Sequence, residues 1–297
     1  MRVDGSLLRG PVVVMFSGGR DSTCLLHVAV SSLGPGAVTA LHVDHGLRPD
    51  SLHDAAHCVR IASSLEVRLV TEKVGPPGAG VGNIQAWARS ARYAAASRLE
   101  GDIAVGHTAS DQVETILYRL AASPGRRALL GMSPREGRIV RPLLGATRTE
   151  TEAYCRDHGL PFLDDPANDD PSYARARVRN DVVPAFRSVH PAAEANVLRT
   201  AELLRDEALA LDAVVDELLG EGEVVALARL REAHPALARL AVRRLAERTL
   251  AARAPRVLSR ADEVLALGPD AALDLGDGAR ARVRAGVLSF ERSPSRD

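Results

Sequence analysis

Lysine and aromatic residues are scarce in this 297-residue sequence. Lys73 is the only lysine among 38 basic residues, and phenylalanine, tryptophan and tyrosine together make up 3% of the chain. Arginine therefore carries almost all of the positive charge, a bias typical of GC-rich coding sequences, so its abundance alone does not indicate nucleic-acid binding. The 38 acidic residues bring the formal net charge to zero. A polyanionic partner would need a local basic patch, because the net charge provides no long-range attraction.

Cysteine is also rare, and long apolar runs are missing. Cys24, Cys58 and Cys155 are far apart and odd in number, which argues against a disulfide framework and against a C-x-x-C metal or redox site. No apolar run approaches the roughly 18 residues that would span a membrane, and no signal-peptide pattern precedes the first apolar run. We therefore expect a cytoplasmic protein without a membrane partner.

A glycine turn after the first apolar run is the most informative segment. Residues 11–16, Pro-Val-Val-Val-Met-Phe, are typical of a strand buried on both faces of a parallel sheet. Ser-Gly-Gly-Arg-Asp-Ser follows at residues 17–22, and the apolar spacing from Asp21 onward predicts a helix. Unpaired N–H groups and the helix dipole both point at such a turn, which makes it an anion site. The alternative is an ordinary strand–helix turn, but the segment is predicted to hold a phosphate.

Strand and helix patterns alternate through the first half of the chain. Further strands are expected at residues 37–43, 66–74, 102–106 and 138–144, and helices from residue 50 or 51, over 83–99 and over 110–122. Repeated strand–helix units favour a parallel sheet with right-handed crossovers. The predicted fold class is therefore α/β, an open, Rossmann-like parallel sheet with helices on both faces, over residues 1–190.

Beyond residue 190 the strand patterns disappear and helical patterns dominate. Residues 192–219 and 234–252 are rich in alanine, leucine and arginine at helical spacing, so a small helical domain is expected over 191–265. Residues 272–275 and 279–290 are separated by Gly-Asp-Gly. This pattern predicts a β-hairpin in a short tail over 266–297.

Polar side chains follow three of the expected strands at the point where each strand ends. The first strand leads into the glycine turn, Asp44, His45 and Arg48 follow the second, and His107 follows the fourth. Ligands of open α/β sheets bind outside the carboxyl ends of the strands. The three segments therefore predict one shared site.

The helix expected after His107 adds two carboxylates to that site. Its buried stripe is predicted at Val113, Ile116, Leu117 and Leu120. Asp111, Glu114 and Tyr118 would then lie on the opposite face, within the first two turns. Acidic residues at a helix amino terminus also have a simpler interpretation, as favourable partners of the helix dipole or as a solvated face. The position beside His107 favours a role in the site.

Several segments together resemble one enzyme family. Residues 17–22 resemble the pyrophosphate loop (PP-loop) of the N-type ATP pyrophosphatases. Successive signatures of the tRNA(Ile)-lysidine synthetases are similar to residues 41–48 (Leu-His-Val-Asp-His-Gly-Leu-Arg), 88–93 (Ala-Arg-Ser-Ala-Arg-Tyr), 106–115 (Gly-His-Thr-Ala-Ser-Asp-Gln-Val-Glu-Thr), 131–132 (Gly-Met), 141–144 (Arg-Pro-Leu-Leu), 165–169 (Asp-Pro-Ala-Asn-Asp) and 175–179 (Arg-Ala-Arg-Val-Arg). The resemblance covers residues 10–190 in order, and the short tail resembles a short form of the family.

The resemblance implies a ligase that forms a C–N bond. Such enzymes adenylate O2 of the wobble cytidine of tRNA(Ile) with a CAU anticodon, and then join free L-lysine to C2, releasing AMP and pyrophosphate. The resemblance implies ATP and magnesium as cofactors. It also implies the fold of the adenine nucleotide alpha hydrolases, and it is compatible with a homodimer.

The resemblance also assigns residues to the site. Nucleotide contacts are implied for Ser17, Gly18, Gly19, Arg20, Asp21, Ser22, Asp44 and His45, with Asp21 also at the magnesium ion. Catalytic roles are implied for His107, Asp111, Glu114 and Arg92, and the two carboxylates would bind the substrate lysine. Contacts with the tRNA backbone are implied for Arg175, Arg177 and Arg179, which would share one face if the segment were extended.

Three departures from the family pattern leave alternatives open. Ser110 stands where the family usually has aspartate, Ala176 where it often has asparagine, and residues 121–127 (Ala-Ala-Ser-Pro-Gly-Arg-Arg) where it has a glycine-rich stretch. One alternative is another PP-loop tRNA-modifying enzyme, such as a thiolase, although such thiolases use paired cysteines or a cluster and the cysteines here are isolated. The other alternative, which Ser110 keeps open, is a non-catalytic nucleotide-binding relative.

Overall fold

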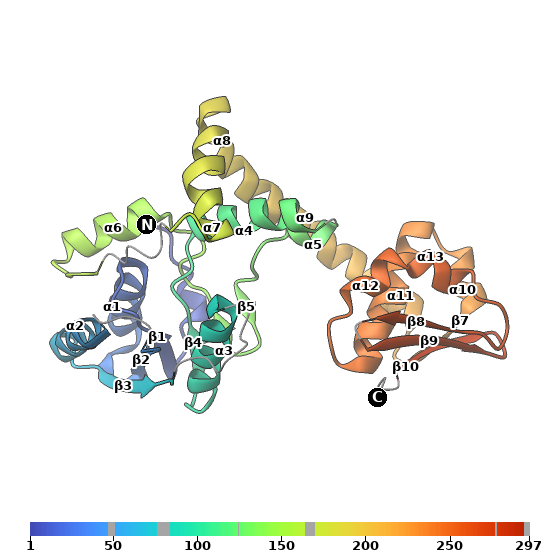
Figure 1. The fold of residues 1–297 in the computed structure, drawn as a ribbon, viewed down its shortest axis with the longest axis horizontal. Coiled ribbons are helices and arrows are strands. Elements are labelled where there is room, and N and C mark those ends of the chain that lie inside the picture. Colours follow the sequence, from blue (N-terminus) through green and yellow to red (C-terminus); the bar gives the residue numbers. More distant parts are fainter. Residues whose placement is uncertain (47–50, 76–83, 124, 164–169, 277, 294–297) are drawn as a thin grey trace. The chain divides into compact units, whose positions relative to one another are not determined.

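The computed structural model describes residues 1–46, 51–75, 84–123, 125–163, 170–276 and 278–293 (Figure 1). The chain separates into two compact units, Met1–Glu202 and Leu203–Asp297. Within the described residues, none of the helices combines the length and the apolar character that crossing a membrane requires.

A six-stranded sheet forms the centre of the first unit, in the order β3-β2-β1-β4-β6-β5. The parallel strands are β1 (Val12–Met15), β2 (Val38–Asp44), β3 (Arg68–Lys73), β4 (Asp102–Ala104) and β6 (Ile139–Val140). The edge strand β5 (Arg135–Glu136) runs antiparallel to β6. Val12 pairs with Val38 on one side and with Asp102 on the other, so β1 lies in the middle of the sheet. The predicted fold class is confirmed, with one antiparallel strand added at the edge.

Helices cover both faces of this sheet. They are α1 (Arg20–Leu33), α2 (Ser51–Ser64), α3 (Ile84–Ser97) and α4 (Ala109–Ala122). Successive side chains of a strand point to opposite faces. Val12 and Val14 accordingly share a core with Leu25 of α1, whereas Val13 packs with Ala96 of α3. The described part of the second helix begins at Ser51, one of its two expected starts, whereas residues 50 and 83 lie outside the described residues.

Another helix of the first unit, α5 (Arg126–Leu129), precedes β5. After β6 come α6 (Arg148–Asp157), α7 (Ala174–Arg177), a π-helical turn at Val178–Val182, α8 (Val183–Val189) and the start of α9 (Ala193–Leu219). Residues 175–179 are therefore helical, and the extended geometry in which all three arginines would share one face does not occur. Arginines at every second position look extended, but Arg175 and Arg179 are four residues apart and share a helix face instead.

The predicted apolar stripe of α4 is wrong at its last member. Val113 and Ile116 are buried, but Leu120 is half exposed and lines an apolar pocket with Phe186 and Val197. Helical spacing selects a face of the helix, but it does not show that Leu120 borders a pocket instead of packing in a core. Glu114 was predicted on the helix face opposite the apolar stripe, yet its side chain is buried.

The second unit combines helices with a four-stranded antiparallel sheet in the order β7-β10-β9-β8. Its helices are the rest of α9, α10 (Leu227–Glu232), α11 (Pro235–Leu250), α12 (Pro255–Ser259) and α13 (Ala261–Leu265). Its strands are β7 (Val224–Ala226), β8 (Ala272–Gly276), β9 (Ala279–Arg284) and β10 (Val287–Arg292). Residues 279–290 thus hold two strands, because the chain turns at Ala285 and Gly286, both at positive φ.

Tail and helices of the second unit share one core. Leu288 and Phe290 of β10 pack in the same cluster as Val242 and Leu245 of α11. The strand β7 was not expected, since the sequence lacks strand patterns beyond residue 190 except in the tail. The assignment of residues 1–190, 191–265 and 266–297 to three functional parts (the α/β domain, the helical domain and the tail) stays a proposal.

Candidate functional site

The glycine turn folds back on itself between β1 and α1. Ser22 Oγ donates to the carbonyl of Gly19 (2.8 Å) and accepts from the amide of Ser17 (3.3 Å). Gly18 has a φ of +79°, a backbone conformation that favours glycine, and its carbonyl accepts from the amide of Leu163 (2.9 Å). The turn is therefore held from both sides, and no side chain caps the amino terminus of α1 that follows it.

A second glycine brings the end of β4 against the start of α1. A Cβ on Gly106 would lie 3.0 Å from the carbonyl oxygen of Asp21 and 3.1 Å from its carbon. Because those atoms belong to the backbone, any larger residue would push the start of α1 away by a few tenths of an ångström, and glycine avoids this shift. The segment that carries His107 is thereby placed directly beside the glycine turn.

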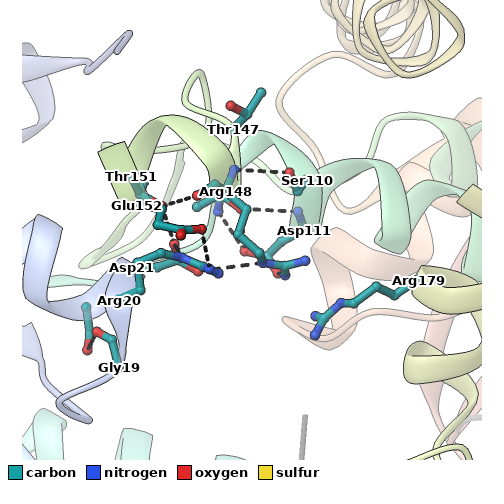
Figure 2. A network of polar contacts seen from close by, with 12 residues as sticks. Gly19, Arg20, Asp21, Ser110, Asp111, Thr147, Arg148, Thr151, Glu152 and Arg179 are labelled. Atoms are coloured by element: carbon teal, nitrogen blue, oxygen red, sulfur yellow. Dashed lines mark hydrogen bonds and ion pairs between the residues drawn. The ribbon is translucent and has the colours of Figure 1, made fainter. Parts of the chain in front are cut away.

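Asp21 connects the glycine turn with α6. Its Oδ1 accepts hydrogen bonds from the Thr151 hydroxyl and from Nε of Arg20 (3.2 Å). Its Oδ2 lies 4.0 Å from Nε of Arg148. The carboxylate is thus surrounded by donors, and one of its oxygens faces the adjoining site (Figure 2).

At the end of β2, Asp44 and His45 lie next to α3. Asp44 Oδ1 accepts from the amide of Gly46 (2.9 Å), and the ring of His45 meets that of Trp87 edge-on at 5.5 Å. Burial, and then the positive charge of Arg92, lower the pKa of His45. Its Nδ1 is buried and has no hydrogen-bond partner among the described residues. A ligand group at this strand end would therefore meet an unsatisfied ring nitrogen.

His107 carries a second unsatisfied ring nitrogen. Its Nδ1 is buried and, across the part of the chain that the structure describes, accepts from and donates to no other group. Burial lowers its pKa to about 4, although the nearby carboxylate of Asp111 acts in the opposite direction. The imidazole is consequently neutral at pH 7 and able to accept a proton or a hydrogen bond.

Asp111 divides its two oxygens between two tasks. Its Oδ2 accepts from the amide and the hydroxyl of Thr108 (both 2.8 Å), which completes a capping box at the start of α4. Its Oδ1 accepts from Arg148 (3.1 Å) and Arg175 (3.2 Å). Burial alone would raise the pKa of Asp111, but these arginines outweigh it and lower the pKa. Asp111 therefore caps α4, as one interpretation predicted, while its role in a functional site stays a prediction.

Glu114 is the most enclosed group of the site, with 2% of its side chain exposed. Three arginines donate to it: Arg148 Nη1 (3.0 Å) and Arg179 Nε (2.7 Å) to Oε1, and Arg175 Nε (3.1 Å) to Oε2. Arg179 Nη2 adds a bond to Oε2 (3.1 Å). We call Asp111 and Glu114 the acidic pair; its full set of arginine partners was not foreseen from the sequence.

Arg148 is the residue of this network that sequence reasoning missed. It stands at the start of α6, after the capping residue Thr147, whose capping box with Glu150 is a recognisable sequence pattern. Its amide donates to Ser110 Oγ (3.2 Å). Ser110, in place of the family's usual aspartate, therefore satisfies one of the free N–H groups at the start of α6.

The structure brings most, but not all, of the predicted residues together. His107, the acidic pair, Arg175, Arg179 and Asp21 form one cluster at the carboxyl edge of β1 and β4. Arg177 is exposed and donates to the carbonyls of Pro171 and Ser172. Arg92 is also exposed and bonds within its own helix, to the carbonyl of Ala88 (3.4 Å). Arg48 and residues 165–169 lie outside the described residues.

Comparison with known proteins identifies the family. A family model described as a PP-loop domain matches residues 7–186, more than half of the chain. A protein of Rhodococcus erythropolis named tRNA(Ile)-lysidine synthase is 38% identical over 244 residues, which cover 79% of this chain and 73% of that protein. The chain belongs to the tRNA(Ile)-lysidine synthase family.

Other members of this family match at similar identity. The tRNA(Ile)-lysidine synthase of Mycolicibacterium paratuberculosis is 40% identical over 73% of this chain and 69% of its own length. That of Pseudomonas fluorescens is 38% identical over 67% of this chain, but only 47% of its own length is matched. The chain thus spans about half the length of the longer family members.

The fold also occurs in a solved tRNA-modifying enzyme. The U34-tRNA thiolase NcsA from Methanococcus maripaludis, solved with its [4Fe-4S] cluster, superposes with a TM-score of 0.55 over 68% of this chain and 76% of its own, at 16% identity. That likeness concerns the fold.

The described residues contain no group of three or more His, Cys, Asp or Glu that could hold a metal ion. Cys58 is buried, and burial raises its pKa to about 12.

Proposed function

We propose that this chain is an ATP-dependent ligase that joins free L-lysine to C2 of the wobble cytidine of a tRNA(Ile) with a CAU anticodon. The observation that carries the proposal is the position of the buried acidic pair beside the glycine turn, in a member of this family. The turn suits a pyrophosphate group, and the acidic pair suits an ammonium group. The two halves of the reaction would therefore take place at one edge of the sheet.

The nucleotide would bind at the glycine turn. Backbone N–H groups at the start of α1 are suited to the β- and γ-phosphates, and the unsatisfied nitrogen of His45 lies at the neighbouring strand end. Magnesium is usually held by one or two carboxylates together with phosphates and waters. Asp21, with one oxygen facing the site, fits such an ion as a single protein ligand. A bound magnesium ion would neutralise charge on the phosphates.

In the first step, O2 of the cytidine would attack the α-phosphorus of ATP. The bond from that phosphorus to the pyrophosphate oxygen breaks, and pyrophosphate leaves from the glycine turn. Adenylation is needed because O2 alone is a poor leaving group. Arg92, exposed near His45, is the proposed stabiliser of charge that develops on the phosphate.

In the second step, the ε-amine of lysine would attack C2, and AMP would leave with O2. The amine has a pKa of about 10.4 in water and must lose a proton before it attacks. The acidic pair would hold the ammonium group, and one of its carboxylates would receive the proton. His107, neutral at pH 7, would lie beside the base or the phosphate as a hydrogen-bond acceptor.

Of the three arginines that the sequence suggests for tRNA contacts, we propose only Arg177 as a contact with the tRNA backbone. Arg175 and Arg179 face Glu114, so their charge acts inside the site. Arg177 points outward from α7 and is the proposed phosphate contact.

The test measures both products. Wild-type protein mixed with ATP, magnesium, lysine and a tRNA(Ile) transcript should release pyrophosphate and yield lysidine on nucleoside analysis. Asp111→Asn should abolish lysidine formation while ATP binding stays close to the wild-type value, because an asparagine side chain at this position can still cap α4. Asp157→Asn, an exposed change on α6, is the control and should keep full activity. Tight ATP binding without pyrophosphate release by the wild type would favour a non-catalytic relative and refute the proposal.

A further inference from the structure

Arg148 is in contact with both halves of the candidate site. Its guanidinium donates to Asp111 (3.1 Å) and to Glu114 (3.0 Å), and its Nε lies 4.0 Å from Oδ2 of Asp21. Figure 2 shows the side chain reaching between Asp21 on α1 and Asp111 on α4. Arg175 and Arg179 also donate to the acidic pair, but no ion pair of theirs with Asp21 occurs among the described residues.

The oxygens of the acidic pair are already occupied by donors. Asp111 Oδ1 accepts from Arg148 and Arg175, and its Oδ2 accepts twice from Thr108. Each oxygen of Glu114 likewise accepts two hydrogen bonds, all of them from Arg148, Arg175 and Arg179. A lysine ammonium has only donors to offer, so it needs acceptor oxygens that these side chains now fill. Lysine binding at the pair therefore requires one arginine to leave.

Arg148 is the arginine best placed to leave. Its backbone is fixed, because its amide donates to Ser110 and the preceding residue caps α6. Its side chain is 23% exposed, and Asp21, the residue it also approaches, is two positions after Gly19 of the glycine turn. A guanidinium group pairs with phosphate at least as well as with carboxylate, often through two parallel hydrogen bonds. Phosphates bound at the turn would offer it a new partner within the reach of one side-chain rotation.

We propose that Arg148 is a positioning residue that couples the two substrates: it occupies the acidic pair until ATP binds, then turns to the phosphates and frees the pair for lysine. The proposal rests on the proposed function. It implies that nucleotide favours lysine binding. By linkage, lysine must favour nucleotide binding by the same factor.

The test measures binding of radiolabelled lysine by equilibrium dialysis, with and without an ATP analogue that carries a methylene bridge between the α- and β-phosphorus. In the wild type the analogue should lower the Kd of lysine by about ten-fold, a typical size for coupled sites. In Arg148→Gln lysine should bind with nearly the same Kd whether or not the analogue is present. Arg148→Lys keeps the charge but loses the planar, forked geometry, so part of the coupling should remain. Arg156→Gln is the control, since Arg156 is exposed on the same helix and pairs with Glu152.

The outcomes separate this inference from the proposed function. A wild-type Kd that is the same with and without the analogue, while lysidine is still formed, would overturn the coupling alone. Undiminished coupling in Arg148→Gln would overturn the role of Arg148. A wild type that binds lysine in neither condition would overturn the proposed function together with the inference. If Arg148→Gln fails to fold, undiminished coupling in Arg148→Lys serves as the refuting result.

Discussion

Neutral His107 makes the first unit sensitive to moderately acidic pH. In the unfolded chain the histidine takes up a proton near pH 6.5, whereas in the folded protein it does so only near pH 4. Between these values the unfolded state binds more protons, so stability falls as the pH is lowered. Between about pH 7.5 and pH 5.0 the two pKa values give a loss of about 2 kcal/mol in the free energy of unfolding. His107→Gln removes the titrating group and should remove this loss.

Trp87, the only tryptophan, allows the loss to be assigned to the correct unit. It lies on α3 in the unit Met1–Glu202, so its fluorescence during urea unfolding reports on the part that contains His107. The quantity to compare is the free-energy difference between wild type and His107→Gln at the two pH values, in which contributions of other groups cancel. His53→Gln, an exposed change on α2, should follow the wild type. A wild-type-minus-variant difference that does not change with pH would refute a neutral, buried His107.

Three further substitutions test the site and the second unit. Glu114→Gln removes the buried charge that three arginines share and should destabilise the first unit by about 2 kcal/mol, below the usual cost of breaking a buried pair because the arginines are partly exposed; urea unfolding followed by Trp87 fluorescence measures it. Gly106→Ala places a methyl group 3.0 Å from the carbonyl oxygen of Asp21 and should weaken ATP binding about ten-fold in dialysis, and an unchanged affinity would show that the turn tolerates the shift. Phe290→Ala should cost about 3–4 kcal/mol in the second unit, seen as an earlier calorimetric transition, while unfolding seen by Trp87 fluorescence stays the same.

Local chemistry explains which parts of the structure could be predicted. The run Val12–Met15 begins with three buried, β-branched residues, which is the pattern of a central parallel strand, and the glycines after it allow a tight turn. Strand ends of a parallel sheet meet at one edge, so His107 and Asp111 could be assigned to the same site as Asp21 before any contact was known. These inferences depend on short stretches of chain.

Contacts between distant segments could not be predicted in this way. Three arginines at every second position are compatible with a strand or a helix, and only the helix brings Arg175 and Arg179 together on Glu114. Arg148 lies 34 residues from Glu114 in sequence, and nothing in the pattern around it indicates a buried partner. Leu120 has the spacing of a core residue, but its side chain borders a pocket formed with residues more than 60 positions later in the chain, such as Phe186 and Val197.

The divided role of Asp111 limits how this site could be redesigned. One oxygen caps α4 and the other faces the arginines, so both the length and the acceptor atoms of the side chain are in use. Glutamate at this position could complete the same capping box, as Glu150 does with Thr147, but its longer side chain would move the second oxygen away from Arg148 and Arg175, and alanine loses the cap together with the charge. An engineer who wishes to admit a shorter or longer amine would keep residue 111 and vary Glu114 with its arginine partners, where the chain length can change without unwinding the helix.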